Sequence, residues 1–190
     1  QVDSQGRLSV SPAPLVSSVD SVTAFPGTVS RATFSAAASF IPAASATDVF
    51  AVIGGTTKTI YITRILVSGT QTTAGNIECV LIKRSSANTG GTFIAANMIP
   101  HDSGNPAATA SAGHYTANPS TGTSLGAVRR ERLLVPAAAS VAPHDHIVWE
   151  FETTGQPIVL KNTSQLLTVN LLGATLTGGL LSVSAEWYEV

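Results

Sequence analysis

The sequence contains few charged residues. Charged side chains make up 11% of the 190 residues, against about a quarter in an average globular domain. The 10 lysines and arginines nearly balance the 11 aspartates and glutamates, which leaves a formal net charge of -1. Nucleic-acid binding requires a concentration of basic side chains, so we expect no nucleic-acid partner. Weak charge also gives little repulsion between copies, which favours the assembly of many identical chains.

Cysteine, aromatic residues and long apolar segments are also scarce. The single Cys79 cannot form an internal disulfide, and its apolar surroundings, Ile77–Ile82, predict a buried structural thiol. This use of cysteine indicates folding in a reducing cytosol. No stretch of about 18 apolar residues occurs, and the N-terminus lacks the pattern of a secretion signal, so we expect no membrane partner.

Two regions of different composition divide the chain. Residues 1–46 are rich in serine, alanine, proline and valine, and Pro12, Pro14, Pro26 and Pro42 interrupt every regular element. This composition predicts an extended N-terminal arm, within which residues 33–40 could form a short strand or a loose ribbon. Residues 47–190 are expected to form one folded domain, since the chain is long enough for a domain and an arm.

Apolar patterning predicts β-strands in the second region. Ile60–Val67 and Ile77–Arg84 are rich in β-branched residues. In the first of these segments the apolar parity changes at Thr63–Arg64, which predicts a β-bulge or a strand buried on both faces. Apolar and polar residues alternate strictly in His146–Glu152 and again in Leu181–Trp187, a pattern typical of half-buried strands.

The same patterning predicts the fold class. Turn signals separate roughly eight strands, and no helix longer than about ten residues is expected. The sequence therefore predicts an all-β protein, an antiparallel two-sheet sandwich of the jelly-roll type, with an immunoglobulin-like sandwich as the alternative. Residues 85–126 are rich in turn residues and are expected to form long loops at one end. Residues 129–135 could form a strand or a short helix.

One cluster has the residue types of a metal site. In the run His144-Asp145-His146 the two histidines point the same way on a strand, and Glu150 follows on that face. His101 or His114 could then complete the ligand set. However, Pro143 marks a turn that enters a strand, where such residues are common. We favour a solvated loop or a contact between copies, and expect no metal and no cofactor.

Two carboxylates have the spacing of a catalytic pair. Glu150 and Glu152 lie about 7 Å apart by strand rise, which overlaps the separation in inverting glycosidases. Neighbouring acidic residues on a solvated strand face are far commoner. The chain also lacks the Gly-x-Ser-x-Gly nucleophile motif, and Gly54–Gly55 and Gly90–Gly91 lack the lysine and helix of a phosphate loop. We assign no catalytic, cofactor-binding or metal-binding residue and expect the protein not to be an enzyme.

The densest charge run is Arg129-Arg130-Glu131-Arg132. It could be a solvated face or could pair with acidic groups of an adjacent copy, because the planar arginine head is favoured at interfaces. The sequence leaves both interpretations open. Asn162-Thr163-Ser164 matches a glycosylation acceptor, and we expect this match to be accidental because no secretion signal accompanies it.

From residue 48 onward, the pattern of strands and turns resembles small structural proteins encoded by tailed bacteriophages. The arm is not covered by this resemblance. The segments that carry it are His146–Phe151, Ile158–Leu160, Leu166–Gly173, Gly178–Trp187, Arg64–Gly75 and Lys83–Thr92.

The resemblance implies a component of a virion that is assembled in the host cytoplasm. It would be a non-enzymatic jelly-roll protein that decorates or cements the capsid as a homotrimer, with the major capsid protein or other virion proteins as partners. The arm would then run across neighbouring subunits. The alternative is a tail- or fibre-associated module that binds a receptor or a carbohydrate through loops 85–126, with His114 and Tyr115 against the sugar.

Overall fold

The computed structural model describes residues 31–139, 145–152 and 155–190, and the compact unit within it spans Ala32–Val190. This unit contains twelve β-strands and no helix among the described residues. The strands are β1 (Ala32–Phe40), β2 (Ala46–Ile53), β3 (Ile60–Gly69), β4 (Gly75–Arg84), β5 (Thr92–Ala95), β6 (Ile99–Pro100), β7 (Ser111–Ala117), β8 (Ser124–Val135), β9 (His146–Glu150), β10 (Ile158–Leu160), β11 (Leu166–Ala174) and β12 (Leu181–Glu189).

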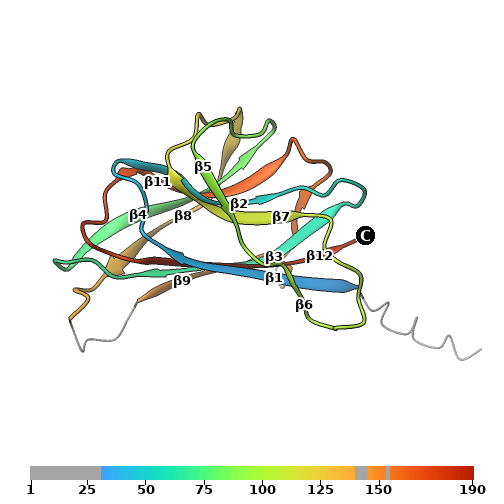
Figure 1. Ribbon diagram of the computed structural model, residues 1–190, viewed down its shortest axis with the longest axis horizontal. Coiled ribbons are helices and arrows are strands. Elements are labelled where there is room, and N and C mark those ends of the chain that lie inside the picture. Colours follow the sequence, from blue (N-terminus) through green and yellow to red (C-terminus); the bar gives the residue numbers. More distant parts are fainter. Residues whose placement is uncertain (1–30, 140–144, 153–154) are drawn as a thin grey trace, which may run out of the picture. The chain divides into compact units, whose positions relative to one another are not determined.

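The strands form two antiparallel six-stranded sheets that pack face to face (Figure 1). The first, here called the β1 sheet, has the order β10-β3-β12-β1-β6, with β9 also paired to β3. The second, the β2 sheet, has the order β5-β7-β2-β11-β4-β8. The prediction of an all-β, two-sheet antiparallel sandwich is therefore confirmed.

Eight of the strands have a regular order. In the β1 sheet they run β1-β12-β3-β9, and in the β2 sheet they run β2-β11-β4-β8. Most connections between these eight strands cross from one sheet to the other, which brings the first and last of them side by side. This order is compatible with a jelly roll built from two Greek keys.

The core lies between the sheets and is formed by the inward-facing residues that alternate along the strands of both sheets. Its largest fully buried side chains include Trp149, Trp187, Phe34 and Phe50. The predicted alternation in 146–152 is confirmed, because Ile147, Trp149 and Phe151 are buried. The same holds for 181–187, whose apolar positions all join this core.

The parity change in β3 is a β-bulge. Strand β12 pairs with β3 in one register up to Glu186, opposite Arg64, and resumes at Trp187, opposite Ile62. Thr63 is therefore the extra residue. The bulge moves the apolar residues on both sides of it onto the core face, as the sequence pattern predicted.

Part of the predicted arm belongs to the sandwich. Residues 32–40 form β1, which pairs with β12 along its whole length, and Phe34 is completely buried. The arm predicted for residues 1–46 thus does not include residues 32–46, and residues 1–30 lie outside the described residues. The weak apolar pattern of Thr33–Phe40 is enough for a strand here because β12 provides its hydrogen bonds and its buried surface.

The segment 85–126 is more regular than the sequence predicts. It contains β5, β6 and β7, and β7 pairs with β2 as an inner strand of its sheet. The ambiguous segment 129–135 is the second half of β8, a strand of 12 residues. Small residues such as Ala112 and Gly113 weaken the propensity signal of β7, and the partner strand compensates for it.

Candidate functional site

The most buried charged group is Asp48, whose exposed fraction is 0%. Both carboxylate oxygens accept hydrogen bonds from Arg84, through Nε at 2.7 Å and Nη2 at 2.8 Å. Asn88 and Asn170 also donate their side-chain amides to Asp48, at 2.8 and 2.7 Å. The four donors satisfy the carboxylate, so it has no free position for a substrate or metal.

This network lies on the outer face of the β2 sheet and fastens two loops over it. Residues 85–91 and 118–123, here called the paired loops, are joined by backbone hydrogen bonds between Thr89 and Ser120. Arg84 donates to the carbonyl of Gly122 at 2.8 Å, and the amide of Gly122 donates to Asn88 at 2.9 Å. A side chain at Gly122 would collide with the backbone of Ser86, so the loops approach this closely only because glycine is present.

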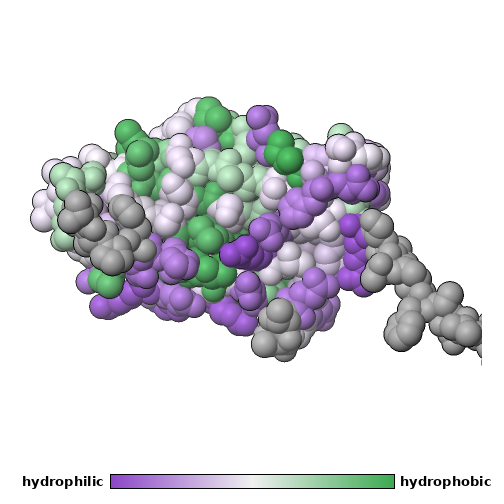
Figure 2. Space-filling model, turned by 90° about the horizontal axis from the view of Figure 1, so that it is seen from below, coloured by the Kyte–Doolittle hydropathy of each residue, from purple (hydrophilic) through white to green (hydrophobic). Residues whose placement is uncertain are grey.

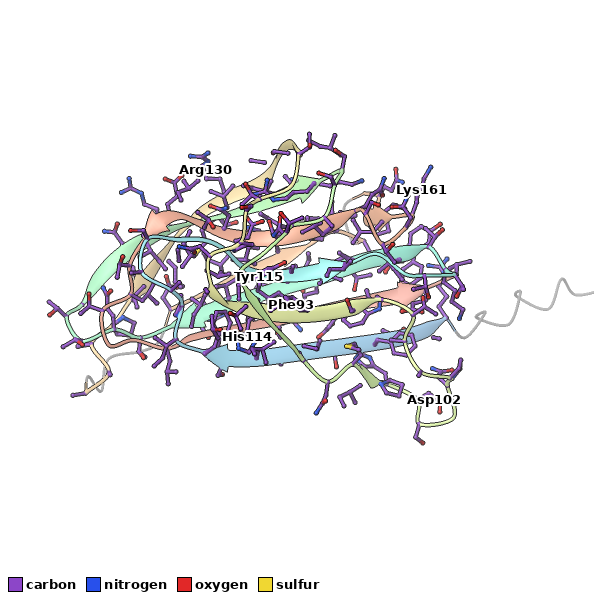
Figure 3. All side chains as sticks on the ribbon, turned by 45° about the horizontal axis from the view of Figure 1, so that its top comes forward. Phe93, Asp102, His114, Tyr115, Arg130 and Lys161 are labelled. Atoms are coloured by element: carbon purple, nitrogen blue, oxygen red, sulfur yellow. The ribbon has the colours of Figure 1, made fainter. Side chains whose placement is uncertain are left out.

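A second apolar cluster lies on the same outer face. It consists of Ala51, Tyr115 and Leu166, with Ile53 and Phe93 packed against them. The rings of Phe93 and Tyr115 are in contact, with 5.0 Å between their centroids. Figure 3 labels both residues. Since Leu166 is fully buried, the outer face is covered around β2, β7 and β11, whereas most residues of β8 stay exposed. We call this outer face the covered face.

A second buried carboxylate has a similar structural role. Glu189 is 4% exposed and accepts hydrogen bonds from the backbone amides of Thr109 and Ala110 and from the Thr109 hydroxyl, at 2.9–3.1 Å. The indole of Trp187 donates to the same carboxylate at 3.2 Å. Glu189 thus holds the segment before β7 against the end of β12.

The structure does not assemble the metal site that the sequence allowed. Among the residues with described positions, no three His, Cys, Asp or Glu side chains lie close enough to hold a metal ion. Asp145 accepts a hydrogen bond from the amide of Leu134 at 3.0 Å, and His146 is an exposed residue of edge strand β9. His101 lies in the loop after β6. His144 lies outside the described residues.

The proposed carboxylate pair is not organised for catalysis either. Glu150 lies 3.8 Å from Arg64, on an exposed part of the β1 sheet. Arg64 also donates to Glu186 at 3.4 Å. Glu152 lies beyond the end of β9 and is exposed. A glycosidase acid requires an enclosed environment that raises its pKa, and an exposed strand edge does not supply one.

The residues considered for carbohydrate binding do not face solvent as a pair. Tyr115 is only 5% exposed, and burial raises the pKa of its hydroxyl, an effect that a hydrogen bond with Asn88 partly offsets. His114 is partly buried and stacks on Phe40 with ring centroids 4.3 Å apart. Burial also lowers the pKa of His114. Both side chains therefore contribute to packing, on opposite faces of β7.

The arginine run makes contacts within its own chain. Arg130 forms an ion pair with Glu78 at 2.8 Å, and Arg129 lies over the ring of Phe151 at 5.6 Å. Glu131 accepts a hydrogen bond from the indole of Trp149 at 3.0 Å. The contacts of Arg129 and Glu131 link β8 to the β9 region of the other sheet, whereas the Arg130 pair joins β8 to β4. A contact of Arg132 with an adjacent copy stays a prediction.

The remaining sequence signals have structural explanations. Cys79 is fully buried, and burial, reinforced by the nearby Glu131 and Glu78 carboxylates, raises the pKa of its thiol to about 12. The prediction of a buried thiol is therefore confirmed. At Gly54, the backbone of Asn162 approaches so closely that no side chain would fit.

The outer face of the β1 sheet differs from the covered face. Over β1, β12, β3 and β9 no described element packs on it, and we call this surface the open face. Figure 2 views the molecule from this side and shows pale and green residues interspersed with purple ones. A shallow hollow of about 240 Å³, lined in part by Ser68, Leu180 and Ser182, lies at one end.

Comparisons with known proteins found no relative. No family model, no curated protein and no solved structure matches the chain. Within the described part of the chain, no helix has the length and apolar character needed to cross a membrane.

Sequence reasoning missed the Asp48 network. A signal was present, because Asp48 is the one charged residue in the strand sequence Ala46–Ile53, which is otherwise mostly apolar. A lone acid in such a strand needs a buried partner. Its partner Arg84 lies 36 positions further along, and only the pairing of β2, β11 and β4 brings the two together.

Proposed function

We propose that this chain is a non-enzymatic structural protein of a bacteriophage virion, with a jelly-roll domain that decorates or cements the capsid. Its partners would be further copies of itself, in the homotrimer that the phage resemblance implies, and the major capsid protein. It would be assembled in the host cytoplasm. Residues 1–31 would extend over neighbouring subunits, where repeated weak contacts gain from high effective concentration.

The open face is the observation that carries this proposal. It spans four neighbouring strands, and small or uncharged side chains occupy most of it, whereas the covered face is sealed by the chain's own loops. A broad, flat and weakly charged surface is suited to contact with other proteins rather than to holding a small substrate.

The buried charges support the same interpretation. Asp48 and Glu189 are the two buried carboxylates among the described residues, and internal donors satisfy both. Catalytic acids and bases usually retain access to a cleft and a perturbed pKa. Here the buried polar groups stabilise loops, so a structural role accounts for them.

Copy number in virions tests the proposal. Particles of the phage that encodes this chain are purified, and their proteins are quantified by gel densitometry against the major capsid protein. We expect an amount comparable with that of the capsid protein, and cryo-electron microscopy should place the sandwich on the outside of the shell. Absence from purified particles would refute the proposal, and a few copies per particle would favour a tail location.

Deletion variants test the role of the N-terminal segment. Removal of residues 1–30 should leave a folded sandwich that no longer binds particles, because all twelve strands remain. Removal of residues 1–45 should prevent folding, since β1 lies between β12 and β6. Circular dichroism measures the fold and co-sedimentation with particles measures binding. Full particle binding by the shorter deletion would exclude a role for this segment.

A further inference from the structure

We propose that the open face is a two-fold interface between two copies of this chain. The inference rests on the proposed function only in that both require copies to associate. The order of side chains on the open face is complementary to itself when one copy is rotated by 180° about an axis that lies in the interface and crosses the strands.

A central uncharged row marks the position of this axis. The strand registers place Ala37 beside Ser184, Ser184 beside Leu66, and Leu66 beside Val148. The residues before and after each of them face the core, so the four side chains lie on the open face in one line across four strands. Under the rotation this row contacts its own copy, and uncharged side chains meet uncharged side chains.

The rows on either side contain complementary groups. On β9, His146 lies two residues before Val148 and Glu150 lies two residues after it. The rotation therefore places His146 of each copy opposite Glu150 of the other, at two symmetric positions. On β3 the same operation places Arg64 opposite Ser68, so no two like charges meet there.

The rotation also brings no two like charges together on the other two strands. On β12, Glu186 is placed opposite Ser182, and on β1, Ser35 is placed opposite Ser39. Hydroxyl groups can donate to the facing carboxylate. The Arg64 side chain is partly exposed, so its guanidinium can donate to the Ser68 hydroxyl of a second copy.

The available area is sufficient for a specific contact. Strands β1, β3 and β12 contribute nine or ten residues each and β9 contributes five, which at a strand spacing of about 4.8 Å covers roughly 520 Å². A symmetric pair buries that area on both copies, which exceeds the approximately 1,000 Å² in total that a biological interface should reach. Two sheets with small side chains can also approach to the spacing of about 10 Å that is usual for stacked sheets.

Light scattering and analytical ultracentrifugation of the purified full chain test the interface. We expect oligomers that contain an even number of copies, six if two of the proposed homotrimers pair. They should dissociate into smaller units in Ala37→Arg, because this variant places two arginines against each other on the axis. The matched control is Ala127→Arg, an equally exposed alanine on strand β8 of the other sheet. The dissociation constant should rise by about tenfold or more in Ala37→Arg and stay unchanged in the control.

A charge exchange tests the rotation itself. His146→Glu should weaken association because two glutamates then meet, and the double variant His146→Glu/Glu150→His should restore it. A chain that is monomeric or strictly trimeric, or a double variant as weak as the single one, would overturn the inference. These outcomes are separate from the virion test. A strict trimer that still decorates particles contradicts only the interface, and an even-numbered oligomer that is absent from particles contradicts only the proposed role in the virion.

Discussion

The two outer faces of the sandwich differ in how much of them the chain covers. Both belong to six-stranded antiparallel sheets, and one side of each sheet packs on the shared core. The chain covers part of the other side of the β2 sheet with its own loops and holds them with the buried pair Asp48 and Arg84. The corresponding side of the β1 sheet carries a row of small and uncharged residues with no loop over it.

The difference shows what burial requires of polar groups. On the covered face each buried polar atom of the Asp48 network has a partner, because an unpaired charge there would cost several kcal/mol. On the open face serine hydroxyls and the half-exposed group around Arg64 keep access to water. The covered face therefore contributes to stability, and the open face is the surface that we propose for association.

The largest effect is expected from breaking the buried pair. Asp48→Ala leaves Arg84 buried without its counter-charge, which should lower the free energy of unfolding by about 3–5 kcal/mol. The control Glu78→Ala removes an exposed pair with Arg130 and should cost about 0–1 kcal/mol. Urea denaturation of both variants measures the two values. Equal losses would show that the paired loops do not depend on Asp48.

Two leucines compare the faces directly. Leu166 on the covered face is fully buried, and Leu66 on the open face is half-buried. Leu166→Ala should lower the free energy of unfolding by about 2–4 kcal/mol through lost burial and a cavity. Leu66→Ala should cost about 1 kcal/mol or less when unfolding is measured on dilute, dissociated chains. A similar cost at both positions would mean that the open face is covered within a single chain.

The smallest effect concerns His114, which lies between the sheets and not on either outer face. Burial lowers its pKa in the folded state, so the unfolded chain binds the proton more readily. Its contribution to stability is therefore complete above the unfolded value of about 6.5 and is lost as the pH falls through the lowered folded pKa. His114→Phe keeps a ring against Phe40 and removes this titration.

Urea midpoints at pH 8 and pH 5 measure the His114 effect. The loss of stability on acidification should be smaller in His114→Phe than in the unsubstituted chain. An identical loss in both proteins would assign the acid sensitivity to other groups.

Local patterns predicted much of the fold. The alternation in 146–152 and 181–187 predicted half-buried strands. The parity change at Thr63–Arg64 predicted a bulge or a strand buried on both faces, and the structure has the bulge. Cys79 was correctly predicted to be buried from its apolar neighbours. These features depend on residues within a few positions of each other, where side-chain periodicity directly reflects which face is buried.

Non-local features were not predictable in this way. The weak strand β1 was assigned to the arm, because its stability comes from pairing with β12 about 150 positions later. Tyr115 was placed in an exposed loop, since nothing near it in the sequence indicates that Phe93 and Leu166 cover it. The paired loops likewise depend on contacts between segments whose turn-rich composition predicts only irregular structure.

The amino-acid sequence alone determined the class of structure: alternating apolar residues, frequent turns and few charges require β-sheets that bury one face. Only the tertiary structure decided which outer face is covered and which is open. The physical reason is that burial of a second face depends on satisfying polar groups from distant segments, as Asp48, Arg84 and Asn88 do. Such partners become neighbours through the strand order and are not adjacent in the sequence.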